Sequence, residues 1–171
     1  AGERVAGFSK RFPSLKLGLR AKFPEIQIKI YARGADPAKL NEKVAEARTW
    51  LLSRVGEKTF STEGEAMQEV VGRRLKQSGA TVAVAESCTG GLISHWLTNV
   101  AGSSAYFLLS AVTYANQAKQ EVLDVSPETL KSRGAVDEQT AAEMAEGVRR
   151  LSGADFAIST TGIAGPEEIG R

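Results

Sequence analysis

Residues 81–91 read Thr-Val-Ala-Val-Ala-Glu-Ser-Cys-Thr-Gly-Gly, a short apolar run followed by a carboxylate, hydroxyls, a thiol and two glycines. A run of this length, bounded by turn-forming residues, is typical of a strand in the interior of a sheet. Hydroxyl residues and glycines favour a turn into a helix, because they cap helices and adopt conformations closed to other residues. The stretch therefore predicts a strand over 81–85 that leads into a helix reaching Trp96 and Leu97.

The order of strand and then helix recurs on both sides of this stretch. Residues 108–113 predict a second strand followed by a helix over 117–123, and residues 155–159 predict a third strand. Further helices are indicated by apolar residues at helical spacing, which are Met67, Val70, Val71 and Leu75 upstream, and Ala141, Met144, Ala145 and Val148 downstream. Such alternation predicts an α/β fold, a layered α/β/α domain with a mainly parallel sheet, over residues 63–171.

Residues 1–62 have a different pattern. An amphipathic helix over 5–12, strands over 15–22 and 26–31, a helix from Asp36 and Pro37 to Leu51, and a short strand over 58–60 predict a small α+β domain. The boundary is expected near residues 61–64, where Thr62 and Glu65 form a candidate capping box for the next helix, which would end at Gly79. Residues 1–60 carry a net charge of +7, against −5 for the remainder. This contrast indicates two modules with different surfaces, or simply two solvated faces.

Composition narrows the functional classes. With 42% hydrophobic and 25% charged residues among 171, the chain is that of an ordinary globular protein, and no run is long enough to cross a bilayer. We therefore expect a cytoplasmic protein without a membrane segment. Cys88 is the only cysteine and His95 the only histidine, so neither a disulfide framework nor a His-based metal site is expected.

Three polar segments follow the predicted strands, and ligands of open α/β sheets bind at this edge. In the first segment, Ser87 is either a nucleophile beside unpaired amides of a helix's first turn, or merely the cap of that helix. In the second, Lys119 is either a general base of lowered pKa at a helix N-terminus, if Asn116 caps that helix, or a solvated surface lysine. Cys88 is a rival nucleophile, and His95 is two helical turns from Ser87 and a poor partner for it.

The third segment, residues 159–166, combines hydroxyls with two glycines, Gly162 and Gly165. Glycines permit close approach of the backbone to a ligand, and hydroxyls donate to anionic oxygens. The spacing matches neither a dinucleotide-binding fingerprint nor a phosphate-binding loop, so a plain loop remains an alternative.

Five motifs in order give the chain a recognisable signature, which comprises residues 85–91, 102–107, 114–119, 134–136 and 161–166. Together they resemble the C-terminal domain of the CinA (competence/damage-inducible) family, and residues 1–62 resemble that family's middle, KH-type domain. The resemblance implies a nicotinamide mononucleotide deamidase, an amidohydrolase of pyridine nucleotide recycling that needs no cofactor or metal. It also implies roles for Ser87 as nucleophile and Lys119 as general base, and favours the catalytic interpretation of both.

The same resemblance places Tyr114 and Thr161 around the substrate, and we expect Thr89, Gly90 and Gly162 to line the same site. A homodimer is expected. The family's usual first domain is not recognisable here, and the family pattern continues beyond Gly165 and Pro166. We therefore expect this length of chain to lack part of the fold and of the phosphate-binding residues.

A second functional class remains open for the basic first module. Its charge is suited to phosphates, so the module is a candidate for binding single-stranded nucleic acid. KH domains bind single strands through a GXXG loop, however, and residues 1–64 contain none. We therefore favour a packing or dimerisation role for the module.

Overall fold

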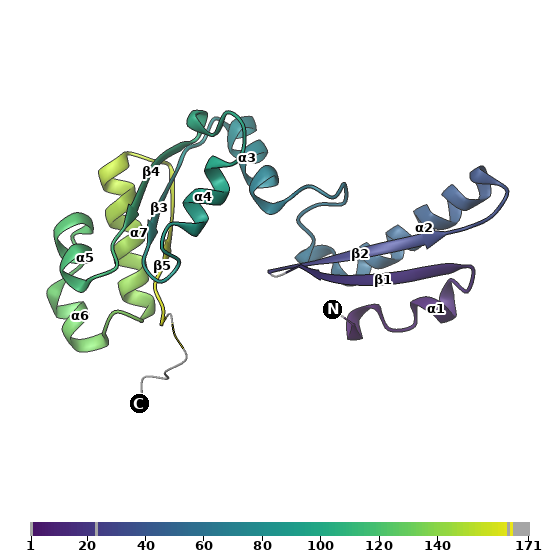
Figure 1. The fold of residues 1–171 in the computed structure, drawn as a ribbon, viewed down its shortest axis with the longest axis horizontal. Helices are drawn as coiled ribbons and strands as arrows, with labels where there is room; N and C mark the ends of the chain where they lie inside the picture. The colour runs from purple at the N-terminus through teal and green to yellow at the C-terminus, as the bar shows by residue number, and fades with distance from the viewer. Residues whose placement is uncertain (1, 23, 164, 166–171) are drawn as a thin grey trace. The chain divides into compact units, whose positions relative to one another are not determined.

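The computed structural model describes residues 2–22, 24–163 and 165. It divides into two compact units, Ala1–Thr62 and Glu63–Arg171 (Figure 1).

The first unit is a β-hairpin packed on a long helix. After a short 3₁₀-helix, η1 (Glu3–Val5), come α1 (Phe8–Arg11), the antiparallel strands β1 (Leu15–Lys22) and β2 (Glu25–Ala32), α2 (Pro37–Val55) and η2 (Gly56–Lys58). Asp36 caps α2, since its Oδ1 accepts from Ala38 N at 3.1 Å and Lys39 N at 3.2 Å. The core is formed by Val5, Phe8, Phe12, Leu15, Ala47 and Leu51.

Two sequence-based predictions for this unit are wrong in detail. The expected helix over 5–12 is split into η1 and α1 by Gly7, whose φ of +86° is a left-handed conformation that interrupts a helix. The strand expected over 58–60 is absent from this described region, where the chain forms η2 and then a loop. Neither segment is long enough for local pattern alone to fix its structure.

The second unit has the predicted α/β class. Its helices are α3 (Met67–Ser78), α4 (Leu92–Thr98), η3 (Ser103–Ala105), α5 (Asn116–Leu123), α6 (Pro127–Arg133) and α7 (Glu138–Ser152). Its strands β3 (Val82–Glu86), β4 (Phe107–Val112) and β5 (Phe156–Thr160) form a parallel sheet in the order β4-β3-β5. The predicted mainly parallel sheet is confirmed, with β3 at its centre.

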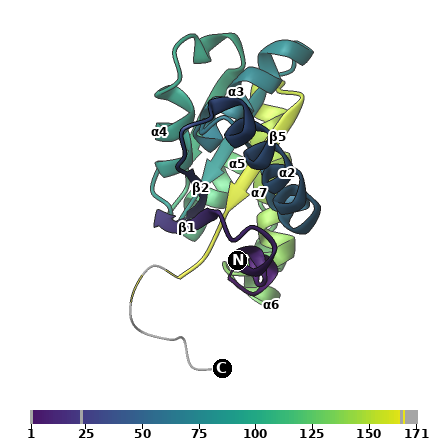
Figure 2. The same ribbon diagram turned by 90° about the vertical axis from the view of Figure 1, so that its right-hand side faces the viewer.

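The central strand explains the layering, because all five of its residues are buried and successive side chains point to opposite faces. On one face, Ala83 and Ala85 pack with apolar side chains of α5, α6 and α7. On the other, Val82 and Val84 pack with Leu97 of α4 and with Tyr106, whose hydroxyl donates to Leu97 O at 3.1 Å. Figure 1 shows α5 and α6 on one side of the three strands and α3 and α4 on the other, and Figure 2 gives the view turned by 90°. The predicted α/β/α arrangement is thus correct.

Two helix starts differ from the predictions. α3 begins at Met67, and the carboxylate of Glu69 accepts from Ala66 N at 2.8 Å, so the capping interaction does not involve Thr62 and Glu65. Glu65 instead forms an ion pair with Arg73 at 3.1 Å.

α5 begins at Asn116 itself, with Ala115 preceding it as N-cap. α6 was not predicted, although Ser126 and Pro127 form an ordinary helix start.

The contact between α5 and α7 depends on Gly147. A Cβ built at this position would lie 2.0 Å from the backbone oxygen of Leu123, and a backbone atom cannot move aside as a flexible side-chain end can. We expect Gly147→Ala to lower the free energy of unfolding by about 2 kcal/mol or more, despite the better helix propensity of alanine. Urea denaturation measures this. The control is Gly56→Ala, where φ is −54° and nothing lies within 4 Å; it should be neutral, and an equal loss there would contradict the packing argument.

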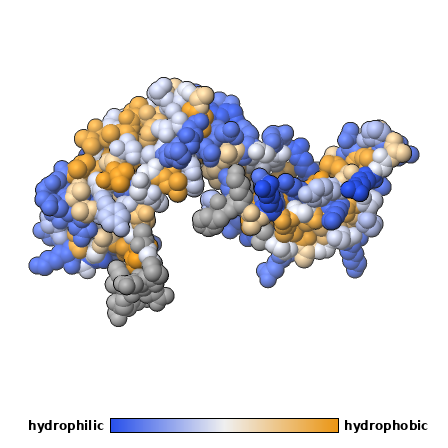
Figure 3. All heavy atoms as spheres, viewed as in Figure 1, coloured by the Kyte–Doolittle hydropathy of each residue, from blue (hydrophilic) through white to orange (hydrophobic). Residues whose placement is uncertain are grey.

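Apolar side chains also reach the surface of the second unit. Figure 3 shows them as orange patches, and the exposed large ones on the outer strands are Leu108, Val112, Phe156 and Ile158. Within the described residues, no helix combines the length and apolar character needed to cross a membrane.

Candidate active site

The carboxyl ends of the three parallel strands meet at one edge of the sheet. Glu86, the last residue of β3, pairs with Val112 of β4 and Thr160 of β5. The residues that follow, Ser87, Thr113 and Thr161, are therefore brought to the same edge, as the positions of the three polar segments predicted.

Ser87 and Lys119 lie in direct contact at this edge. Lys119 Nζ is 3.1 Å from Ser87 Oγ, although the two residues are 32 positions apart in the sequence. Both are buried, with 5% of Ser87 and 1% of Lys119 exposed. The interpretation of Lys119 as a solvated surface lysine is wrong, because α5 directs it into the interior rather than outward.

Lys119 has an unusual set of partners for a buried cation. Besides Ser87, its amine donates to the backbone oxygens of Thr113 at 2.8 Å and Tyr114 at 2.9 Å. None of the ion pairs formed among the described residues involves Lys119. Burial lowers the pKa of Lys119 below its usual value, while nearby Cys88 acts in the opposite direction. The amine therefore gives up its proton more readily than an exposed lysine.

The helix position of Lys119 differs slightly from the prediction. Since Asn116 is the first residue of α5 and Ala115 its cap, Lys119 is the fourth helical residue, not the third. It remains in the first turn, where the helix dipole also disfavours a positive charge.

The expectation that Ser87 lies beside unpaired amides of a helix's first turn is wrong, because Glu86 binds those amides. Its buried carboxylate accepts hydrogen bonds from the amides of Gly91, Ile93 and Ser94, at 3.1, 3.1 and 2.9 Å, and from the Ser94 hydroxyl at 2.6 Å. Burial alone would raise the pKa of Glu86, but these hydrogen bonds, led by those of Ser94, hold that pKa below its usual value. The first-turn amides of α4 are thus taken by Glu86 and are not free beside Ser87.

The chain between Ser87 and α4 is a tight glycine-containing turn. Gly90 N donates to Ser87 O at 3.1 Å, and Gly90 and Gly91 have φ of +60° and +100°, which only glycine adopts readily. Ser87 N donates to Thr160 O at 3.1 Å and so fixes the start of the turn on β5. In the part of the chain that the structure describes, the amides of Cys88 and Thr89 donate to no other residue.

The remaining predicted site residues surround this turn in different ways. The hydroxyl of Thr89 lies 2.7 Å from that of Thr160, and a Cβ at Gly162 would lie 3.1 Å from Cys88 Sγ, so the third segment packs against the first. The Tyr114 side chain is 67% exposed. The Thr161 hydroxyl donates to Ala135 O, which holds the start of the third segment against the loop before α7.

Sequence reasoning missed two members of the site. In the sequence Glu86 only follows the apolar run, and the fold shows that its carboxylate caps α4. Thr113 is buried, and its hydroxyl has no hydrogen-bond partner among the described residues. Unsatisfied buried hydroxyls are rare and commonly mark a place for water or ligand, so Thr113 joins the candidate site. A polar residue just after a strand was the only signal in the sequence.

The position of His95 agrees with its being a poor partner for Ser87. His95 pairs with Asn99 at 3.1 Å on the exposed side of α4, and no group of three or more His, Cys, Asp or Glu side chains is arranged to hold a metal ion.

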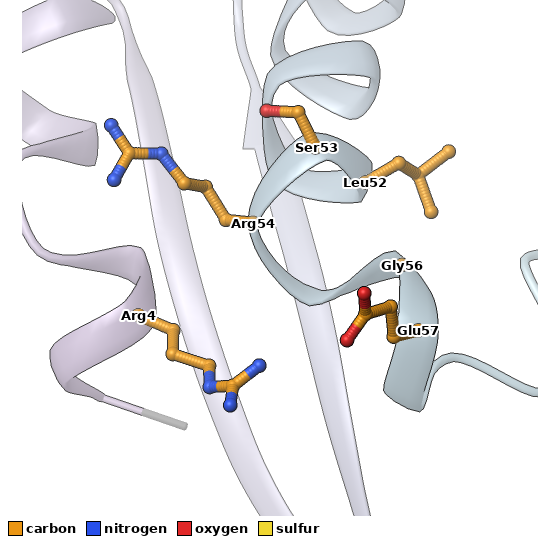
Figure 4. Close-up of a pocket in the computed structure, with 6 residues that line it drawn as sticks. All are labelled: Arg4, Leu52, Ser53, Arg54, Gly56 and Glu57. Atoms are coloured by element: carbon orange, nitrogen blue, oxygen red, sulfur yellow. The ribbon is translucent and has the colours of Figure 1, made fainter.

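The first unit contains a separate hollow of about 200 Å³, lined by Arg4, Leu52, Ser53, Arg54, Gly56 and Glu57 (Figure 4). The two arginines suit an anion, but Glu57 and the carbonyl end of α2 oppose one, and the lining contains no activated nucleophile.

Comparisons with known proteins agree on one family. A family model described as the CinA C-terminal domain matches residues 64–170. The CinA-like protein of Desulfosudis oleivorans is 54% identical over 165 residues, covering 96% of this chain and 40% of that protein. The CinA-like protein of Desulforapulum autotrophicum is 47% identical over 165 residues, covering 96% and 39%. The chain thus spans about two fifths of the length of these relatives.

Solved structures give the same result. The competence/damage-inducible protein CihA from Agrobacterium tumefaciens is 47% identical with a TM-score of 0.56, and the match covers 61% of this chain and 66% of that one. The competence damage-inducible protein A (ComA) from Klebsiella pneumoniae is 42% identical with a TM-score of 0.56, covering 57% and 60%.

Proposed function

Because this chain belongs to the CinA family, we propose that it carries the serine amidohydrolase site of a nicotinamide mononucleotide deamidase. The reaction converts the carboxamide of nicotinamide mononucleotide into a carboxylate and releases ammonia. The observation that carries the proposal is the buried contact of 3.1 Å between Lys119 Nζ and Ser87 Oγ. A serine in contact with a lysine of lowered pKa is an activated nucleophile with its base.

The hydrogen bonds of Lys119 support the role of base. A neutral amine has two N–H donors and one lone pair. Two carbonyl acceptors, Thr113 O and Tyr114 O, can take both N–H groups, which leaves the lone pair for the hydroxyl proton of Ser87. The third contact of the amine is thus reversible: Ser87 donates to neutral Lys119, and protonated Lys119 donates to the Ser87 oxygen.

The proposed reaction proceeds in two halves. Ser87 Oγ attacks the carboxamide carbon while its proton passes to Lys119, and Lys119 then gives that proton to the departing nitrogen, which leaves as ammonia. The resulting ester on Ser87 is cleaved by water, whose proton passes through Lys119 and returns to Ser87 Oγ. No metal or cofactor is required at either step.

The negative oxygen of each tetrahedral intermediate needs hydrogen-bond donors. The amides of Cys88 and Thr89 are the donors that the turn offers, since the first-turn amides of α4 are bound to Glu86. We assign the surface that contacts the substrate to Tyr114, Thr161, Thr89, Gly90 and Gly162. We also propose that the enzyme acts as a homodimer.

The test is ammonia release from nicotinamide mononucleotide as a function of pH, in the longest form of the protein that contains these residues. Because the neutral amine is the base, kcat/KM should rise with pH and level off above the pKa of Lys119, which burial lowers from the usual value of lysine. No release of ammonia at any pH would overturn the proposed function. A kcat/KM that does not change with pH would exclude Lys119 as the base whose titration controls the rate.

A further inference from the structure

The β-hairpin of the first unit has one face turned away from the core. The register pairs Lys16 with Tyr31, Gly18 with Lys29 and Arg20 with Gln27. Directly paired residues share a face, so these six side-chain positions lie together, opposite the Leu17 and Ile30 positions that pack toward α2. We call these six positions the outer hairpin face. Figure 1 shows the two strands side by side along α2.

An aromatic ring lies over Gly18 on this face. A Cβ built at Gly18 would lie 2.8 Å from Tyr31 Cε2 and 3.6 Å from Cζ, so the ring rests on the backbone where Gly18 has no side chain. Tyr31 is nevertheless 51% exposed. The ring thus contacts the strand at Gly18, while about half of the residue stays accessible, so a base can stack on an aromatic side chain that the sheet helps to hold.

Three cationic residues share the outer hairpin face with this ring. Lys16 and Arg20 are exposed and Lys29 is half-buried, and none of the three forms an ion pair with a described residue. Glu25, at the turn end of the hairpin, is the nearest acidic residue along these two strands. The outer hairpin face thus combines positive charge with an exposed ring, and both are complementary to a single-stranded nucleic acid.

We propose that the outer hairpin face binds single-stranded nucleic acid, with a base stacked on Tyr31 and phosphates held by Lys16, Arg20 and Lys29. The missing GXXG loop argues against binding in the KH manner, but a sheet face with aromatic and basic side chains needs no such loop. Lys16 and Arg20 are about 13 Å apart at 3.3 Å per residue, which fits roughly two or three nucleotides.

The experiment is fluorescence anisotropy of the whole chain with labelled single-stranded oligouridine and oligothymidine at several salt concentrations. Tyr31→Ala should weaken binding about tenfold, since one base loses its stacking partner, and Tyr31→Phe should retain binding. Gly18→Ala changes no charge but places a methyl group where the ring lies, and it should weaken binding several-fold.

A matched pair of lysines tests the phosphate contacts. Lys16→Ala should reduce the slope of log affinity against log salt by about 0.7, while Lys43→Ala, an equal change of charge on the exposed side of α2, should leave it unchanged. Thermal unfolding of each variant checks that the hairpin survives.

Three outcomes would overturn the proposal. They are no binding of either oligonucleotide at low salt, undiminished binding by both Tyr31→Ala and Gly18→Ala, and equal competition by heparin, which would indicate a polyanion surface without base stacking. Tighter binding of oligouridine than of oligothymidine, or the reverse, would identify the ligand as RNA or DNA and would support the assignment of the outer hairpin face in either case.

Discussion

Replacement of Ser87 by alanine is expected to lower kcat for ammonia release by about a thousandfold or more, with little change in stability. The hydroxyl is the proposed attacking group, and no other side chain in contact with Lys119 can form the ester. Its hydrogen bond to Lys119 is the only one that the Ser87 side chain forms among the described residues, so alanine removes no hydrogen bond that holds the turn. Ammonia release under saturating substrate, together with thermal unfolding, measures both effects.

The matched control is Cys88→Ala in the adjacent position. Cys88 carries the other nucleophilic atom of the turn and lies against the segment that contains Gly162. Its replacement should preserve most of the activity, since only its amide is assigned a part in the reaction. If the cysteine variant were the inactive one and Ser87→Ala remained active, the assignment of the nucleophile would be wrong.

Lys119→Arg and Lys119→Ala are both expected to lower kcat by about 10² to 10⁴-fold, the range for loss of a general base. Arginine keeps the positive charge but does not deprotonate in proteins, so it cannot accept the proton of Ser87. The comparison of the two variants separates the two roles that a lysine could have here. An electrostatic role would be retained by arginine and lost in alanine, whereas a base is lost in both.

The pH profile supplies the control for this pair. The wild-type rise of kcat/KM should be absent from the residual activity of either variant, because the titrating group is gone. Arginine is larger than lysine and Lys119 is 1% exposed, so unfolding curves must show that the variant still folds. Substantial activity in a folded Lys119→Arg variant would exclude the general-base role.

Local pattern alone determined much of the fold. Asp36 and Pro37 start α2 as expected, since capping and a fixed proline φ act within one turn. The apolar run before Glu86 gave the central strand of a parallel sheet, because a strand covered by helices on both faces excludes polar residues from its middle. The same reasoning chose the wrong pair at α3, where two local patterns overlap: the capping interaction joins Ala66 and Glu69 rather than Thr62 and Glu65.

For the candidate site, the sequence identified the strand ends at which Ser87 and Lys119 stand, and the family resemblance suggested their roles. Only the tertiary structure decided between their alternatives. It buries Lys119 beside Ser87 and assigns the first-turn amides of α4 to Glu86. It also leaves the Thr113 hydroxyl without a partner among the described residues.

The physical reason is the range of the forces involved. Caps, turns and periodic burial depend on neighbours within a few residues, so a sequence displays them directly. The pKa of a lysine and the partner of a hydroxyl depend instead on which strands lie side by side and on how much water they exclude. In this chain the pairing of β3 with β4 brings Ser87 to Lys119, and the pairing of β1 with β2 lays Tyr31 over Gly18.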